Sequence, residues 1–277
     1  MDRLIYHNEG IIDAPDARVA PTLAGVLYGW GVFTTLRIYD GKAFEFERHW
    51  ERLLRHAEKA RVSVPIDGKQ ASQALAELVA ANSTAQGRAR LTVLKGEAGS
   101  WRGVSDRPAE VLIFTSSEMP RPRSELAITI SPYRLLSTSQ LAGIKQTAML
   151  ENLFALEEAR ARGFADAVKL NERGEVVATT AANLFWVQGD EVFTPSLGTG
   201  CVAGVTRRIV QEIIARWQLH LVEGSFTVNR LHDAREVFLT SSAREIAIVS
   251  SFDKTEYNPK DARIAGLISR EYQKLII

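Results

Sequence analysis

Cysteine is almost absent from this sequence, and long apolar runs and an excess of one charge are missing altogether. Cys201 is the only cysteine among the 277 residues, which excludes an internal disulfide and a thiolate metal cluster. We therefore expect no metal site. A single free thiol is typical of a reducing compartment, so we expect a cytoplasmic protein.

The distribution of apolar and charged residues also argues against a membrane or a nucleic acid as partner. The longest apolar runs, such as Val111–Phe114, are strand-sized and far shorter than a spanning helix. The opening residues, MDRLIYHNEG, become polar too early for a signal peptide. The net charge of +1, without any block of like charge, lacks the basic stripe of a nucleic-acid binder.

The segment Met119–Ser124 separates two halves, because its two prolines within three residues suit neither a helix nor a central strand. We expect an α+β fold of two domains, residues 1–118 and 126–277, joined by a linker over residues 119–125. A cleft between two such domains is a common place for a small-molecule site.

Apolar periodicity and turn residues predict the elements of each half. Strands are expected at Leu4–Tyr6, Gly10–Asp13, Val32–Tyr39, Ala43–Phe46, Ala89–Lys95, Glu110–Ser116, Leu126–Ser131, Ala167–Leu170, Glu175–Val177, Leu184–Val187, Glu191–Phe193, Glu236–Thr240 and Ile246–Ser251. Helices are expected at about Phe46–Ala60, Lys69–Ala81, Leu150–Arg162 and Thr206–Trp217, and at the end of the chain.

Lys145 is the first residue that could carry chemistry. It lies in the stretch LAGIKQTAML, whose apolar residues on both sides would remove water from the amine. A desolvated lysine has a lowered pKa and can act as a nucleophile. Most lysines are solvated surface charges, so this feature is suggestive only in combination with others.

Three further segments could bind a phosphate. Gly204-Val205-Thr206-Arg207 precedes an apolar-periodic helix, and free amides at a helix start form an anion site. Thr240-Ser241-Ser242 ends a strand with three hydroxyls, and Arg52 lies in a predicted helix. Each is also common in an ordinary role, as a helix cap, a turn and a solvated arginine. An amine and three phosphate-binding segments together would suit one phosphorylated aldehyde cofactor.

Several motifs also occur in a fixed order along the chain. They are Tyr28-Gly29-Trp30-Gly31-Val32-Phe33, His49-x-x-Arg52-Leu53, Ile144-Lys145, Asn183-Leu184-Phe185, Thr194-Pro195, Gly204-Val205-Thr206-Arg207 and Ser242-Ala243-Arg244-Glu245-Ile246. In these motifs the chain resembles the class IV aminotransferases, the fold-type IV pyridoxal-phosphate family. The resemblance implies a smaller N-terminal α/β domain, a larger barrel-like C-terminal α/β domain, pyridoxal 5'-phosphate as cofactor and a homodimer.

The resemblance also implies roles for single residues. Lys145 would be the Schiff-base lysine, and the C-terminal domain would contribute further cofactor ligands. The residues implied to bind the cofactor, besides Lys145, are Arg52, Asn183, Val205, Thr206, Ser241, Ser242 and the residue at position 178. Tyr28 and Arg102 are candidate substrate ligands, Arg102 through a substrate carboxylate.

Within the family, local matches favour aminodeoxychorismate lyase. They include Phe33-Thr34-Thr35, Leu141-Ala142-Gly143-Ile144-Lys145 and Ala181-Ala182-Asn183-Leu184-Phe185-Trp186. Thr35 is a candidate hydroxyl that directs the substrate or a proton, although it could equally be an ordinary strand residue.

Position 178 departs from the family pattern. The family has a glutamate five residues before the Asn of Asn-Leu-Phe, where it pairs with the pyridine nitrogen of the cofactor, and here this residue is Ala178. A carboxylate there keeps the nitrogen protonated and the ring a strong electron sink. Either the residue has been replaced deliberately, or the natural chemistry needs less electron withdrawal.

We therefore expect a lyase that converts a small amine, 4-amino-4-deoxychorismate, to 4-aminobenzoate and pyruvate in the synthesis of a folate precursor. One alternative is an aminotransferase of the same family that acts on a D-amino or branched-chain acid. Another is a cofactor-binding protein with little or no turnover, for which Ala178 is the only support.

Overall fold

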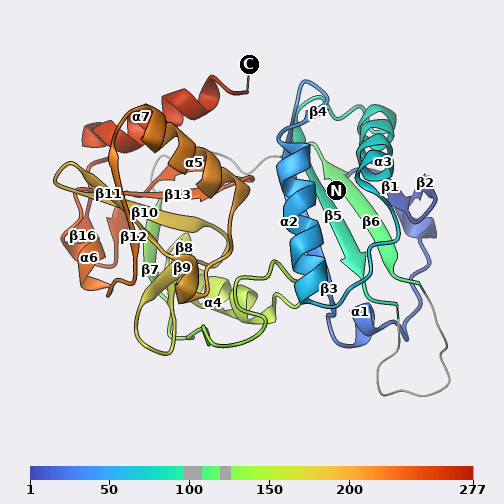
Figure 1. The fold of residues 1–277 in the computed structure, drawn as a ribbon, viewed down its shortest axis with the longest axis horizontal. Coiled ribbons are helices and arrows are strands. Elements are labelled where there is room, and N and C mark those ends of the chain that lie inside the picture. Colours follow the sequence, from blue (N-terminus) through green and yellow to red (C-terminus); the bar gives the residue numbers. More distant parts are fainter. Residues whose placement is uncertain (97–107, 119–125, 277) are drawn as a thin grey trace. The chain divides into compact units, whose positions relative to one another are not determined.

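The computed structural model describes residues 1–96, 108–118 and 126–276, and its contacts divide the chain into two compact units (Figure 1). The first unit comprises Met1–Pro120 with Ile144–Ala148, and the second comprises Arg121–Gly143 with Met149–Ile277. The predicted linker at 119–125 lies outside the described residues. The stretch around Lys145 packs with the first unit, whereas the sequence-based division placed it in the second domain.

The first unit is an antiparallel sheet with helices against one face (Figure 1). The strand order is β2-β1-β6-β5-β3-β4. The elements are β1 (Leu4–His7), β2 (Gly10–Asp13), α1 (Ala24–Leu27), β3 (Gly31–Tyr39), β4 (Lys42–Ala43), α2 (Phe46–Lys59), α3 (Gly68–Ala81), β5 (Gly87–Leu94) and β6 (Glu110–Ser116), with a 3-10 turn at Ala14–Asp16.

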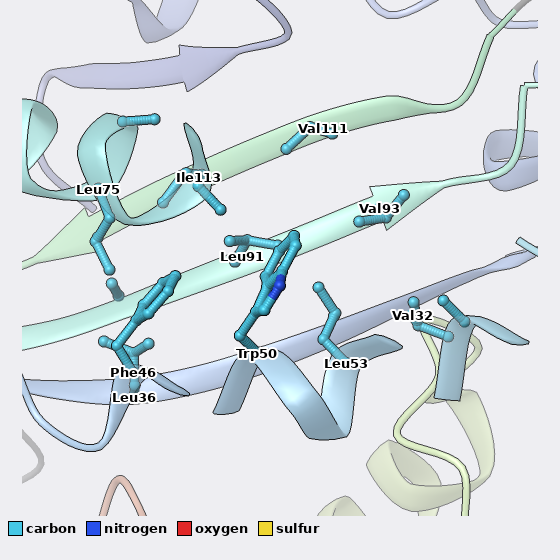
Figure 2. Packing of buried hydrophobic residues seen from close by; sticks show 14 of the residues in the cluster. Val32, Leu36, Phe46, Trp50, Leu53, Leu75, Leu91, Val93, Val111 and Ile113 are labelled. Atoms are coloured by element: carbon cyan, nitrogen blue, oxygen red, sulfur yellow. The ribbon is translucent and has the colours of Figure 1, made fainter. Parts of the chain in front are cut away.

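Apolar residues at helical spacing attach α2 to this sheet. Phe46, Trp50 and Leu53 form one stripe of the helix and point toward Leu36 of β3 and Leu91 of β5 (Figure 2). Side chains on one stripe of a helix and on one face of a sheet can be buried together. The same stripe fixes which side chains of α2 lie over the start of β3, where the candidate site is found.

The second unit contains two five-stranded sheets with helices against them. The sheet orders are β12-β11-β10-β13-β14 and β16-β15-β7-β8-β9. The strands are β7 (Ala127–Ile130), β8 (Asp166–Leu170), β9 (Val176–Thr179), β10 (Asn183–Gln188), β11 (Glu191–Pro195), β12 (His220–Gly224), β13 (Glu236–Ser241), β14 (Glu245–Ile248), β15 (Ser251–Phe252) and β16 (Thr255–Glu256). The helices are α4 (Leu150–Ala161), α5 (Val205–Arg216), α6 (Asn229–His232) and α7 (Arg263–Gln273), with 3-10 turns at Leu197–Thr199 and Pro259–Asp261.

The predicted α+β (α/β) class is confirmed, and two predicted strands are wrong in extent. The strand expected at Ala43–Phe46 ends at Ala43, because Phe46 is already the first residue of α2. The strand expected at Ile246–Ser251 is two strands in different sheets, since β14 ends at Ile248 and β15 begins at Ser251. Among the described residues, no helix is long and apolar enough to cross a membrane.

Two neighbouring leucines of α2 test the packing of the first unit. Leu53 is 1% exposed and Leu54 is 40% exposed. Leu53→Ala should reduce the free energy of unfolding by about 2–5 kcal/mol, because it leaves a cavity between α2 and the sheet. Leu54→Ala should change it by less than about 0.5 kcal/mol. Urea unfolding followed by tryptophan fluorescence measures both, and equal losses would contradict this packing.

Candidate active site

A short segment that contains Lys145 runs beside the start of β3. The amide of Phe33 donates to the carbonyl of Lys145, and the amide of Thr147 donates to the carbonyl of Gly31, each over 3.0 Å. On its other side, the amide of Lys145 donates to Nδ1 of His56 over 3.0 Å. Both backbone polar groups of Lys145 are therefore used, one by β3 and one by α2, and this fixes the lysine relative to the sheet.

The amine of Lys145 lies in surroundings that disfavour its charged form. The side chain is half-buried, and Nζ lies 4.5 Å from the centroid of the Phe33 ring. Desolvation, with repulsion from Arg52 and Arg90, lowers the pKa of Lys145 to about 7. At neutral pH a large fraction of this amine is uncharged, as a lysine nucleophile or base requires.

Arg52 of α2 is a buried cation. Its Nη2 donates to Oγ1 of Thr34 over 2.8 Å, and its Nε has no hydrogen-bond partner in the described part of the chain. Burial and the neighbouring Arg55 lower the pKa of Arg52 to about 10. No acidic side chain within the described ranges forms an ion pair with Arg52. Because an unpaired charge is costly to bury, this guanidinium is suited to an anion.

His49 completes a hydrogen-bonded group with Thr34 and Arg52. Its Nδ1 lies 2.7 Å from Oγ1 of Thr34. Burial, with repulsion from Arg52 and Lys145, lowers the pKa of His49 well below its ordinary value, so the ring is neutral. Since Arg52 donates to the Thr34 oxygen, the hydroxyl can donate to Nδ1, and we infer that Nε2 carries the ring proton.

Arg90 of β5 is a second cation near the lysine. Its guanidinium carbon lies 3.7 Å from the centroid of the Phe33 ring, and its Nε donates to Oγ1 of Thr92 over 3.2 Å. Burial lowers the pKa of Arg90. Thr35 lies directly opposite Arg90 in the register of β3 and β5, so the two side chains share one face of the sheet. The predicted hydroxyl of Thr35 is thus next to a cation that could hold a carboxylate.

In the second unit, the residues at the start of α5 pack closely against Asn183. The side chain of Asn183 donates to the carbonyl of Val202 over 2.9 Å. A Cβ at Gly204 would lie 2.2 Å from Oδ1 of Asn183, so only glycine fits before the helix. The amides of Val205 and Thr206 belong to the first helical turn, where no carbonyl of the helix can accept from them. These amides are available to an anion.

Hydroxyl groups at the end of β13 lie beside this helix start. Thr240 is paired directly with Asn183 across β10 and β13, and its buried Oγ1 has no partner among the described residues. Ser241 follows, and its Oγ accepts from the amide of Arg244 over 3.1 Å. Ser242 comes next in the turn. The second unit therefore brings Asn183, the α5 amides and these hydroxyls together, as one phosphate site would require.

The remaining predicted residues are placed as follows. Tyr28 is 46% exposed directly after α1, and Arg102 lies outside the described residues. Ala178 is half-buried in β9, opposite Lys169 of β8.

The sequence-based predictions missed His56 and Arg90. A signal for the first was present, since His49, Arg52 and His56 follow one another at helical spacings of three and four. Arg90 carried no such signal, because its relation to Lys145 arises only through the pairing of β5 with β3.

Comparisons with known proteins extend this description. Residues 31–252 match the family described as Amino-transferase class IV. The chain is 29% identical to an aminodeoxychorismate lyase of Bacillus subtilis, over 99% of this chain and 94% of that protein. It is also 29% identical to a putative branched-chain-amino-acid aminotransferase of Methanocaldococcus jannaschii, over 92% of this chain and 90% of that protein. The crystal structure of a branched-chain aminotransferase from Thermoproteus uzoniensis superimposes with a TM-score of 0.92 at 27% identity, covering 100% of this chain and 95% of that one.

Fold and comparisons together define a pyridoxal 5'-phosphate-dependent enzyme. The chain belongs to the Amino-transferase class IV family. The residues present fit this cofactor, because the helix start at Gly204, beside Asn183, is suited to its phosphate. In the first unit, the unpaired Arg52 is likewise suited to an anion. The lowered pKa of Lys145 likewise suits an amine that must react with an aldehyde.

The lowered pKa of Lys145 can be measured in the protein without cofactor. Labelling of Lys145 by trinitrobenzenesulfonate, read by peptide mass spectrometry, should be half-maximal near pH 7. Arg90→Met should move this midpoint to higher pH, because it removes a repelling cation. Arg88→Met, two residues away on β5, is the matched control and should leave the midpoint in place. A midpoint unchanged by Arg90→Met would refute the contribution of Arg90 to the lowered pKa of Lys145.

The contact between His56 and the Lys145 amide predicts a pH dependence of stability. Burial and nearby cations lower the pKa of His56 from 6.5 to about 4, so between these values the unfolded chain binds a proton that the folded chain does not. The free energy of unfolding should therefore fall by about 2 kcal/mol as the pH drops through this range.

Two variants separate titration of His56 from loss of its hydrogen bond. His56→Asn keeps an acceptor for the Lys145 amide and should remove this part of the pH dependence. His56→Leu should remove it as well but lose about 1–3 kcal/mol at neutral pH, because the buried amide has no acceptor. Denaturant unfolding between pH 4 and pH 7 tests this, and a variant with the wild-type profile would contradict it.

Proposed function

We propose that this enzyme is a 4-amino-4-deoxychorismate lyase, which forms 4-aminobenzoate and pyruvate. The observation that carries the proposal is the half-buried Lys145, with its lowered pKa and fixed backbone, next to the unpaired cations Arg52 and Arg90. The lyase-like motifs around Phe33, Lys145 and Asn183 and the similarity to an aminodeoxychorismate lyase support this choice.

The cofactor ligands in this proposal are those that the family resemblance implies. Lys145 would hold the cofactor through its aldehyde group, and Arg52, the amides of Val205 and Thr206, and Ser241 with Ser242 would bind its phosphate. When bound, pyridoxal phosphate supplies an electron-withdrawing ring that stabilises negative charge on the carbon bearing the substrate amine.

Lys145 then acts twice on the substrate. Its uncharged Nζ would remove the proton from the substrate carbon that bears the amine. The same Nζ, now charged, returns a proton to the departing enolpyruvyl group, which leaves as pyruvate while the ring becomes aromatic. A pKa near 7 suits both tasks, because the group must accept and release a proton at neutral pH.

Arg90 and Thr35 orient the substrate in this scheme. The substrate carries two carboxylates, and Arg90 is a half-buried guanidinium without an ion-pair partner in the described ranges. A charge-assisted hydrogen bond from arginine to a carboxylate is strong and directional. The Thr35 hydroxyl, on the same sheet face, would direct the substrate or a proton.

A second candidate is an aminotransferase for a branched-chain or D-amino acid, which the similarity to enzymes with those names favours. It would use the same lysine and the same phosphate ligands and return the amine to a keto acid. The homodimer implied by the family resemblance stays a prediction for either function.

Product identification separates the two functions. The lyase should release pyruvate and 4-aminobenzoate from aminodeoxychorismate, whereas an aminotransferase should convert the cofactor absorbance to that of pyridoxamine phosphate with an amino acid alone. Lys145→Ala should abolish both the lyase reaction and the visible absorbance band. Arg90→Met should reduce kcat/KM about 10- to 100-fold through loss of a charged hydrogen bond, and Arg88→Met should not. Absence of both lyase products would refute the proposal.

A further inference from the structure

The replacement of the family's glutamate by Ala178 leaves open which group of this chain meets the cofactor's pyridine nitrogen. Three carboxylates lie on β8 or in the turn between β8 and β9, and each of them has other partners in the structure. Asp166 accepts from Arg244 over 2.6 Å and from the hydroxyl of Thr180 over 2.6 Å. The other two carboxylates lie in the turn after β8.

In that turn, Glu175 pairs with Arg173 over 2.7 Å and accepts from Asn171 over 2.7 Å. Glu172 accepts from the amide and the hydroxyl of Ser137, each over 2.7 Å. Both carboxylates are therefore held at the turn between β8 and β9, and neither takes the place of a carboxylate at position 178.

The residue directly across from Ala178 is a buried lysine. Lys169 of β8 pairs with Ala178 of β9 in the antiparallel register, so the two side chains leave the same face of the sheet. Val168 and Leu170, its neighbours along β8, belong to the apolar core on the opposite face. Lys169 is only 5% exposed, and the small side chain of Ala178 leaves the space beside it free of a carboxylate.

Lys169 has hydrogen-bonding capacity to spare. Its Nζ donates to Oδ1 of Asn152 over 2.9 Å, and Nδ2 of Asn152 donates in turn to the carbonyl of Thr180 over 2.7 Å. An ammonium has three donors, and in the described part of the chain this one meets a single neutral acceptor. Burial lowers the pKa of Lys169, and the exposed Glu151, the residue before Asn152, opposes this without forming an ion pair in that part of the chain. A nearly buried ammonium with one neutral partner is suited to a further acceptor.

We propose that Lys169 donates a hydrogen bond to the pyridine nitrogen of the cofactor from its place opposite Ala178, and so keeps this nitrogen unprotonated. The inference rests on the proposed function for its premise that position 178 faces the pyridine nitrogen. Two neighbouring positive charges repel each other, so an ammonium at this place disfavours a protonated ring, whereas a carboxylate favours it. The family's glutamate accepts a hydrogen bond from a protonated pyridine nitrogen. In this proposal Lys169 instead donates a hydrogen bond to an unprotonated pyridine nitrogen.

The protonation state can be read without measuring turnover. The holoenzyme is reconstituted with pyridoxal phosphate labelled with nitrogen-15 in the ring, and its nitrogen resonance is recorded. In the wild type it should have the position of an unprotonated, hydrogen-bonded pyridine. Lys169→Met should shift it toward that of an unprotonated pyridine without a donor. The double variant Lys169→Met/Ala178→Glu should give the protonated resonance. A protonated nitrogen in the wild type would overturn the proposal, and this measurement needs no variant to fold.

Two further variants test whether the resonance depends on Lys169 in particular. Lys95→Met removes a lysine of the first unit that donates to the Arg61 carbonyl, and it should leave the resonance unchanged. Glu151→Gln should also leave it unchanged, and a shift there would overturn the proposal in favour of the exposed carboxylate. Loss of the visible band in Lys145→Ala shows separately that the proposed lysine holds the cofactor. A normal band with a resonance that Lys169→Met does not move would refute only the role of Lys169.

Discussion

The need to keep one amine uncharged at neutral pH governs the arrangement of the first unit. Lys145 meets this need through desolvation and through the repulsion of Arg52 and Arg90. Such an arrangement is unfavourable by itself, because two cations, Arg52 and Arg90, lie near the amine without an ion-pair partner in the described part of the chain. It becomes favourable when anions arrive, and a cofactor phosphate and a substrate carboxylate are anions of that kind. Arg52 and Arg90 thus lower the pKa of Lys145, and both are suited to bind an anion near it.

The backbone around the lysine makes this tuning possible. A lysine side chain is long and flexible, and it would reach water if its own backbone could move. Here the carbonyl of Lys145 is held by β3 and its amide by His56 of α2. The apolar stripe of α2 places His49, Arg52 and His56 over the same strand. The core of the first unit therefore determines the electrostatics of the amine.

Many helices and strands of the fold could be predicted from the sequence, and those that could not have physical reasons. The stripe at Trp50, Leu53 and Ala57 predicts α2 because helical periodicity is a local property, and helix α5 follows in the same way. The break between β14 and β15 escaped prediction, since a continuous apolar run does not show that the chain passes from one sheet to another.

At the site, motif resemblance pointed to Arg52 and Lys145, and their roles toward the cofactor stay predictions. Arg90 and Lys169 could not be found in this way, because their significance depends on strand registers. Arg90 lies opposite Thr35 and Lys169 lies opposite Ala178, and a shift of one residue would turn either side chain to the other face. The irregularity after Lys169 in the pairing of β8 with β9 makes that register especially hard to infer from sequence.

The protonation state of the ring nitrogen affects how efficiently the enzyme can catalyse each of the two candidate reactions. Transamination requires the ring to accept negative charge fully and to release it again at a second carbon, which a protonated nitrogen favours. Elimination that ends in an aromatic ring gains stabilisation from the product itself, so the cofactor has less to supply. An ammonium near the nitrogen would therefore cost an aminotransferase more than a lyase. The proposed contact of Lys169 with the ring nitrogen is therefore consistent with the lyase function on which it rests.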